Sequence, residues 1–333
     1  MKEHNSSLWL CILSSLALAF FIAFLYRLTE GALLRGTDTP NYVRYFIENN
    51  YYFIEPLFVI FSKLIRNFTY DPKIYLFILD YITNFLSFLS ICCIHRRVYR
   101  GVPHVFFFFV LLLSFSSYHL MQINAIRQSL GLPFAIFSLC FFLTSNYKLS
   151  VIFLLFASAF HTSYLILFVT YTISYLLKRN LKLFSFLYIF IAAVVSSMLL
   201  YLPKVVNLYV IWKFQSLNRP STGIIPPILK YFYLWFIFIV AYLAIFRSNL
   251  QKRFFDLILI YYSFLLSLLP FIRISMIINR YFLLGEVLLI LLMPLILLRM
   301  NKYSRWMFIF AYSFISFIFL INFPTIRHEF HLD

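Results

Sequence analysis

Long apolar runs recur along almost the whole chain, and they constrain its fold more than any other feature. A run of about 18 residues or more with few charges is long enough to cross a bilayer as a helix. The first such run covers residues 8–26, and others follow at short intervals as far as residue 323. The segments between them are too short for a soluble domain of ordinary size. We therefore expect an all-α, polytopic membrane protein with about 10–11 transmembrane helices, in which residues 1–333 form a single transmembrane domain.

The charged residues indicate how the loops are placed. A net charge of +17 would suggest a nucleic-acid partner in a soluble protein, but this chain is 63% hydrophobic and only 12% charged. In such a chain, Lys and Arg hold short loops on the cytoplasmic side of the membrane. The basic run HRRVYR, residues 95–100, marks that side, so that the N-terminus lies inside and the loop 27–72 lies outside. We expect a surrounding lipid bilayer and no nucleic acid.

Three segments depart from a simple series of spans. Residues 51–65 are apolar but are interrupted by Glu55-Pro56 and are too short to cross comfortably, which predicts a helix lying in the membrane interface. Residues 149–177 are too long for one span, so we expect a broken hairpin that turns near His161 in a cavity. Residues 203–227 form a second, long outer loop. The remaining spans are expected at residues 73–94, 103–120, 128–145, 183–202, 228–246, 254–272, 281–298 and 306–323.

Arg127 and His161 are the two leading candidates for a function, because they lie at or inside apolar runs. A charge or an imidazole at hydrocarbon depth is unfavourable, so each needs a reason to be there. Arg127 starts a helix on the outer side, and it either binds a phosphate at that helix N-terminus or only extends to the interface. His161 either caps a break in its helix or acts as a general base, since an unperturbed imidazole titrates near neutral pH.

Five further polar residues lie on the expected outer side. Arg273 and Arg280 flank a short loop, and they either add positive charge for a diphosphate or simply end their spans. Asp38 is either the N-cap of a helix or an acid that faces the site, and Tyr42 would lie on the same face of that helix. For Glu55 we expect a capping role at the start of its helix.

Other polar residues and the cysteines fall within the apolar runs. Asp80 and Glu286 are deep enough to suggest a proton path, with Tyr, Thr or Asn expected as their structural partners. The four cysteines have no CxxC spacing, so we expect neither a disulfide nor a metal site. With 44 Phe and only 6 Gly, the helices should pack through bulky side chains rather than through close glycine contacts.

Signatures of nucleotide chemistry are missing from the sequence. It has no P-loop, no Gly-rich dinucleotide motif and no cluster of metal ligands. A donor that already carries a diphosphate leaving group would suit such a chain, because its departure mainly needs positive charge and correct positioning. We therefore expect no cofactor and no metal.

Four short motifs between residues 35 and 165 occur in one order and at fitting positions relative to the spans. They are DTPNY with Asp38 and Tyr42, EPLF starting at Glu55, IRQ with Arg127 and Gln128, and HTS starting at His161. In this order, the motifs resemble those of the EpsG-like and Wzy-type bacterial polysaccharide polymerases. The second half of the chain is similar only in its hydropathy and in the sequence Asn279-Arg280-Tyr281.

The resemblance implies a GT-C-like helical membrane domain and a glycosyltransferase that polymerises repeat units of O-antigen, capsule or exopolysaccharide. The growing glycan would move from undecaprenyl diphosphate to a hydroxyl of an acceptor repeat unit, at the outer face of the bacterial cytoplasmic membrane and without a metal. Its partners would be undecaprenyl-diphosphate-linked oligosaccharides and a chain-length regulator protein. The implied roles are base for His161, acceptor orientation or an alternative base for Asp38, diphosphate binding for Arg127, Arg280 and Arg273, and acceptor-sugar binding for Tyr42, Glu55 and Gln128.

Three other functions fit part of the sequence. A ligase that transfers finished polymer to another acceptor would use the same outer arginines and histidine. A flippase or other transporter of lipid-linked oligosaccharides would need paired halves and a central ionisable path such as Asp80–Glu286, but no internal repeat is evident. A membrane O-acyltransferase would also need a buried histidine, but not several outer arginines. We therefore expect a polymerase.

Overall fold

The computed structural model of the protein describes residues 2–28, 38–51, 54–98, 109, 112–113 and 116–176, together with short runs and single residues between 253 and 310. Every element assigned in these residues is a helix, and none is a strand, so the all-α expectation is confirmed for the described part. The number of spans stays a prediction. The spans predicted at 183–202 and 228–246, the outer loop 203–227, and the residues Arg273 and Arg280 lie outside the described residues.

The chain divides into two compact units, Met1–Leu165 with Met300–Asp333, and Ile166–Arg299. Helix α9 (Leu165–Leu176) starts at the boundary and lies almost entirely in the second unit. Within that unit, the Tyr261 hydroxyl donates to the Tyr281 carbonyl at 2.7 Å. The candidate site residues that the structure describes all belong to the first unit.

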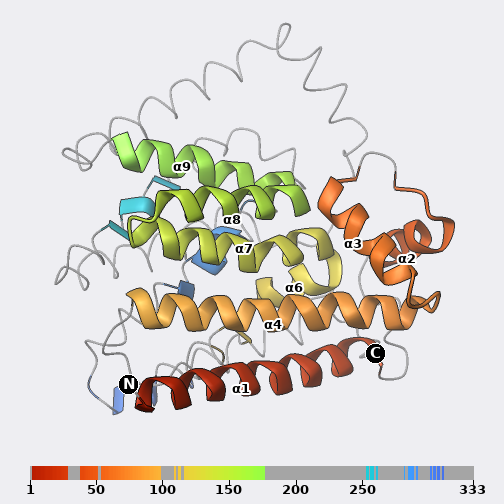
Figure 1. Ribbon diagram of the computed structural model, residues 1–333, viewed down its shortest axis with the longest axis horizontal. Helices are drawn as coiled ribbons and strands as arrows, with labels where there is room; N and C mark the ends of the chain where they lie inside the picture. Colours follow the sequence, from red (N-terminus) through yellow and green to blue (C-terminus); the bar gives the residue numbers. More distant parts are fainter. Residues whose placement is uncertain are drawn as a thin grey trace, which may run out of the picture. The chain divides into compact units, whose positions relative to one another are not determined.

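Four long helices of the first unit lie side by side in the order α1, α4, α7 and α8 (Figure 1). They cover Lys2–Arg27, Pro72–Val98, Ile126–Leu143 and Tyr147–Phe160. Helices α4 and α7 are each long and apolar enough to cross a membrane. Helices α1, α4 and α7 therefore lie where the sequence predicts spans at 8–26, 73–94 and 128–145.

Helix α1 buries small side chains, although the many phenylalanines led us to expect bulky packing. Ser15, Ala19 and Ala23 follow one another at four-residue spacing and are fully buried, on the helix that packs against α4. Phe20 and Phe21 are instead more than half exposed. Bulky contacts are also present, since the Phe20 ring lies edge-on to Phe77 and Tyr81 of α4 with centroid separations of 5.6 Å and 6.4 Å, so this helix combines both kinds of packing. Small residues let two helix backbones approach closely, which is how helices associate where lipid is as apolar as the side chains.

Two short helices, α2 (Thr39–Glu48) and α3 (Pro56–Arg66), pack near one end of this row (Figure 1). At about 1.5 Å per residue, α3 is about 16 Å long and cannot cross a bilayer, which agrees with the predicted short helix. The Phe46 ring of α2 stacks on Tyr75 of α4 with 4.0 Å between centroids. Arg66 donates to the Phe46 and Ile47 carbonyls and so ties α3 to the end of α2.

Two helices break where the sequence predicts a turn. Helix α6 (Ser116–Asn124) ends just before Ala125, so that Arg127 becomes the second residue of α7. Helix α8 ends at Phe160, and His161 then adopts an extended backbone with φ −159° and ψ 124° before the 3-10 turn η1 (Thr162–Tyr164). Whether the chain then returns as the second arm of a hairpin stays a prediction, because α9 lies in the second unit.

Gly131 brings α7 close to the turn that follows His161. A Cβ atom at this position would overlap the Tyr164 ring and would lie only 2.9 Å from the Ala157 carbonyl oxygen. The Tyr164 hydroxyl also donates to the Gln128 carbonyl one turn earlier in α7. The turn η1 and the first turns of α7 therefore pack directly against each other.

Candidate functional site

The Arg127 guanidinium forms the centre of a cluster at the start of α7. Its Nη1 donates to the Glu55 carboxylate in an ion pair, and its Nε lies 3.5 Å from the Tyr42 hydroxyl. The guanidinium carbon also lies 5.9 Å from the centroid of the Tyr42 ring, in range for a cation–π contact. Three segments far apart in the sequence, α2, the start of α3 and the start of α7, therefore meet at Arg127.

Glu55 connects this cluster to the break after α8. It occupies the N-cap position of α3 but makes no side-chain cap hydrogen bond, so the expected capping role is wrong. Its carboxylate is instead turned toward Arg127 with one oxygen and accepts from the Thr162 backbone N–H with the other, at 3.4 Å. A hydrogen bond from a charged guanidinium stabilises a carboxylate more than one from a neutral backbone N–H does. This explains why the Glu55 side chain pairs with Arg127 and does not cap its own helix.

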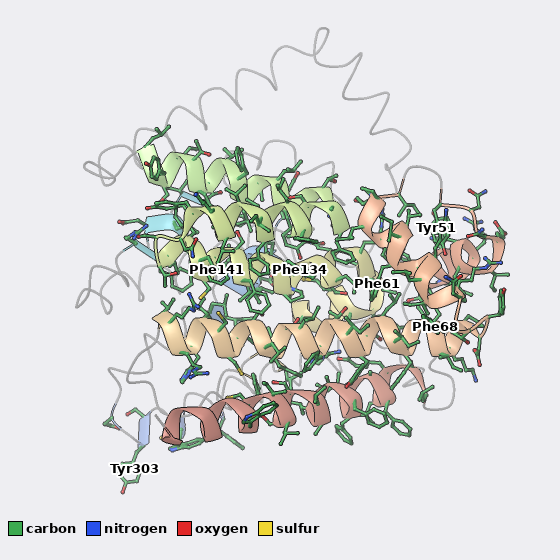
Figure 2. All side chains as sticks on the ribbon, viewed as in Figure 1. Tyr51, Phe61, Phe68, Phe134, Phe141 and Tyr303 are labelled. Atoms are coloured by element: carbon green, nitrogen blue, oxygen red, sulfur yellow. The ribbon has the colours of Figure 1, made fainter. Side chains whose placement is uncertain are left out.

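Aromatic rings from α3, α7 and the end of α8 also pack together next to this cluster. Figure 2 shows Phe61 on α3 and Phe134 on α7, and the Phe160 ring contacts both, with centroid separations of 6.2 Å and 5.5 Å. Phe160 immediately precedes His161. The contacts of the Phe160 ring therefore fix the position of His161 relative to α3 and α7, as expected for a site built on packed elements.

The Arg127–Glu55 pair is only partly buried. The Arg127 side chain is 19% exposed and the Glu55 side chain 11%. A guanidinium in such a position has access to a ligand and keeps part of its donor fork available to a phosphate, which its planar geometry suits. The cluster can therefore bind an anion, provided that the anion displaces or shares the Glu55 carboxylate.

The imidazole of His161 is held by Ser163. Its Nδ1 accepts from the Ser163 backbone N–H at 3.2 Å and lies 2.7 Å from the Ser163 Oγ. Because a backbone N–H can only donate, Nδ1 is the unprotonated nitrogen, and a neutral His161 carries its proton on Nε2. His161 therefore caps the turn that follows it, which confirms the capping interpretation, although our expectation of Ser158 as its partner is wrong, because Nδ1 accepts from the Ser163 N–H. Its role as a base stays a prediction.

The other predicted site residues are distributed as follows. Asp38 takes the N-cap position of α2 without a side-chain cap hydrogen bond and is half-buried. Tyr42 is 4% exposed and faces Arg127. The Gln128 side chain is fully buried beside Arg127, so its predicted contact with a sugar would need a change of conformation.

A second arginine–carboxylate pair, Arg27 with Asp80, lies fully buried between α1 and α4. The Arg27 Nε donates to Asp80 Oδ2 at 2.5 Å, and its Nη2 donates to the Gln122 carbonyl at 3.1 Å. The sequence led us to expect Tyr, Thr or Asn as the partner of Asp80, and to place Arg27 in the outer loop. Both expectations are wrong, because α1 continues to Arg27 and a carboxylate buried in a membrane helix needs a cation.

Polar side chains extend this buried cluster along one face of α4. Asn84 donates to the Asp80 carbonyl at 2.7 Å and accepts from the Tyr118 hydroxyl of α6 at 2.8 Å. Within the described residues, Arg27 Nη1 and Asp80 Oδ1 find no hydrogen-bond partner. Buried polar atoms of this kind are commonly satisfied by ordered water.

Two functional contacts escaped the sequence analysis. Thr39, which follows Asp38 in the DTPNY motif, is fully buried and donates to the Ile123 carbonyl at 2.7 Å. Arg27 donates to the neighbouring Gln122 carbonyl. Together, Thr39 and Arg27 therefore satisfy two backbone carbonyls at the end of α6, just before Arg127. Ser163 was likewise not singled out, although it holds His161. The motifs themselves contained the signal, since Thr39 and Ser163 lie within DTPNY and HTS.

Comparison with known proteins identifies the family of this chain. A model of the EpsG family matches residues 8–330, nearly the whole chain. No curated protein and no solved structure matches it. The EpsG family comprises Wzy-like polymerases of polysaccharide biosynthesis, which are broadly glycosyltransferases. A match over almost the full length shows that this chain is a membrane protein that belongs to the EpsG family.

Proposed function

We propose that this protein polymerises lipid-linked oligosaccharide repeat units of a bacterial surface polysaccharide. It transfers the growing glycan from undecaprenyl diphosphate to a hydroxyl of an acceptor repeat unit, without a metal. The chain crosses the cytoplasmic membrane many times, and the reaction takes place at the outer face of that membrane. Family membership supports the general activity, and the donor, the acceptor and the orientation are parts of the proposal.

The observation that carries the proposal is the meeting of four motifs in one cluster around Arg127 and Glu55. Arg127 of IRQ contacts Tyr42 of DTPNY and Glu55 of EPLF, and Glu55 in turn accepts from Thr162 of HTS, which lies 107 positions away. A partly exposed guanidinium in this position suits a diphosphate, because charge-assisted, two-pronged hydrogen bonds to phosphate are strong and directional.

The chemistry asks little more of the protein than positioning and charge. As the anomeric carbon leaves the diphosphate, negative charge builds up on the departing phosphate oxygen, and a preorganised guanidinium stabilises it. In this proposal Arg127 is the main diphosphate ligand, and Arg273 and Arg280 add charge. Tyr42 and Gln128 contact the acceptor sugar, and Asp38 orients it.

The experiment replaces Arg127 with Ala in a strain whose surface polysaccharide is separated on a gel. We expect the long-chain ladder to disappear while a single capped repeat unit remains on the surface. The matched control is Arg44→Ala on α2, because Arg44 is exposed and contacts only Asn41 among the hydrogen bonds of the described residues. That variant should keep the ladder.

Two other outcomes would replace the proposal. A surface without any repeat unit would indicate a flippase, since no unit would then reach the outer face. Polymer that is made at full length but is not attached to its final acceptor would indicate a ligase. A normal ladder in Arg127→Ala would contradict the assignment of Arg127.

A further inference from the structure

The Glu55 carboxylate contacts both Arg127 and the break at His161, one with each of its oxygens. We propose that Glu55 removes the proton from the acceptor hydroxyl, and that Arg127 holds Glu55 until the donor diphosphate takes its place. This inference rests on the proposed function and assigns a catalytic residue and an order of events within it.

The position of His161 supports this choice. A neutral imidazole can take a proton only on its unprotonated nitrogen, which here is Nδ1. Nδ1 already accepts from the Ser163 N–H and lies 2.7 Å from the Ser163 hydroxyl oxygen. Protonating it would break the hydrogen bond from the Ser163 backbone N–H, which shapes the turn, and would leave only the Ser163 hydroxyl oxygen as a partner. His161 is therefore a positioning residue, because its turn presents the Thr162 N–H to Glu55.

The Arg127–Glu55 ion pair can separate when a competing anion binds. With 19% and 11% of the two side chains exposed, water and ligands can reach the pair, unlike the sealed pair of Arg27 and Asp80. A diphosphate carries more negative charge than one carboxylate and matches the guanidinium fork at least as well. Binding of the donor would therefore take Arg127 from Glu55. A carboxylate that has lost its cation and lies beside an anion attracts a proton more strongly than one in an ion pair.

The reaction balances without any additional reagent. The acceptor hydroxyl gives its proton to the Glu55 carboxylate, and its oxygen forms a bond to the anomeric carbon of the donor. The bond from that carbon to the diphosphate oxygen breaks, and its electron pair stays on the lipid diphosphate that Arg127 holds. Glu55 then releases its proton to water. When the lipid diphosphate leaves, Glu55 pairs with Arg127 again.

The experiment measures binding and turnover separately on the full-length protein in lipid nanodiscs. The binding probe is undecaprenyl diphosphate, and turnover is polymer formation from a purified lipid-linked repeat unit. Glu55→Gln removes the competing charge and the base together. We expect it to bind the probe about threefold or more tighter than the unmodified protein, and to form polymer about 100-fold or more slowly. A purely structural role of Glu55 would not strengthen binding.

The matched control is Glu48→Gln, which changes an exposed glutamate at the end of α2. It should leave both measurements unchanged. Polymer formation at the normal rate by Glu55→Gln, or weakened binding of the probe, would overturn the inference and leave the proposed function intact. Failure of the unmodified protein to bind the probe or form polymer would instead contradict the proposed function.

If Glu55→Gln does not fold, a variant that keeps the negative charge tests the role of Glu55 as a base. Glu55→Asp withdraws the carboxylate by one methylene. It should bind undecaprenyl diphosphate within about threefold of the unmodified protein but form polymer about tenfold or more slowly, since proton transfer depends on reach. An unchanged rate of polymer formation would overturn the inference.

Discussion

The described part of the chain contains two arginine–carboxylate pairs that differ in how far they are removed from solvent. In Arg27–Asp80 the side chains are 0% and 1% exposed, whereas in Arg127–Glu55 they are 19% and 11% exposed. The buried pair joins α1 to α4 and holds the end of α6 through the Gln122 carbonyl. The same two chemical groups can therefore fix a framework where they are sealed, and exchange partners with a ligand where they are open.

Removing one member of the buried pair should have the largest effect on stability. Asp80→Ala leaves the Arg27 guanidinium buried without its counter-charge, which should lower the free energy of unfolding by about 3–5 kcal/mol. Thermal unfolding of the detergent-solubilised protein measures this. The double variant Arg27→Met with Asp80→Leu should lose much less, because it leaves no buried charge. A single variant as stable as the unmodified protein would show that the pair does not fix the framework.

Replacing a member of the partly exposed pair, Arg127–Glu55, should lower the rate of polymer formation more than the stability of the protein. Arg127→Ala should slow polymer formation about 100-fold or more, because one charged donor to the leaving group is lost. Its free energy of unfolding should fall by less than that of Asp80→Ala, because Glu55 keeps some contact with water when its partner is removed. Arg127→Lys should lie between the two in rate, since lysine lacks the planar fork. Equal destabilisation by Arg127→Ala and Asp80→Ala would remove the distinction between the pairs.

A smaller effect should come from the hydroxyl that works alongside the buried pair. Thr39→Val removes the donor to the Ile123 carbonyl and leaves that carbonyl buried without it. This should lower the free energy of unfolding by about 1–3 kcal/mol, measured as above. Thr39→Ser retains the hydroxyl and should be close to the unmodified protein. If valine and serine at this position are equally stable, the hydrogen bond does not support the break before Arg127.

The smallest effect is expected at the histidine near the open pair. Ser163→Ala removes the Oγ contact to His161 Nδ1 but keeps the backbone N–H, so stability should fall by about 0.5–1.5 kcal/mol. Nitrogen NMR of histidine-labelled protein should still show the proton on Nε2. A proton on Nδ1 in this variant, or in the unmodified protein, would restore His161 as the candidate base.

The sequence predicted local features of the site well. Apolar runs indicated α1, α4 and α7, and interruptions in those runs indicated the breaks before Arg127 and at His161. Such features depend on residues that are close together in the chain, so the pattern of hydropathy along the sequence predicts them directly. The order of the four motifs also indicated, through the family resemblance, which segments belong to one site.

Partners across the fold could not be predicted in the same way. Asp80 pairs with a residue 53 positions away on α1, and Glu55 with one 72 positions away on α7. No local pattern states which helix faces which, so Glu55 looked like a helix cap and Arg27 like a loop residue. The close packing of α1 escaped for a related reason. Composition counts phenylalanines but does not say that Phe20 and Phe21 stay more than half exposed while Ser15, Ala19 and Ala23 are buried.

The close approach at Gly131 has an evolutionary consequence. The ring of Tyr164 fills the space that a methyl group at position 131 would need. Related chains with alanine at the equivalent position must therefore carry a smaller side chain opposite it, or shift the HTS turn away from the arginine. Across the family, the residues equivalent to Gly131 and Tyr164 should therefore vary together, large against small.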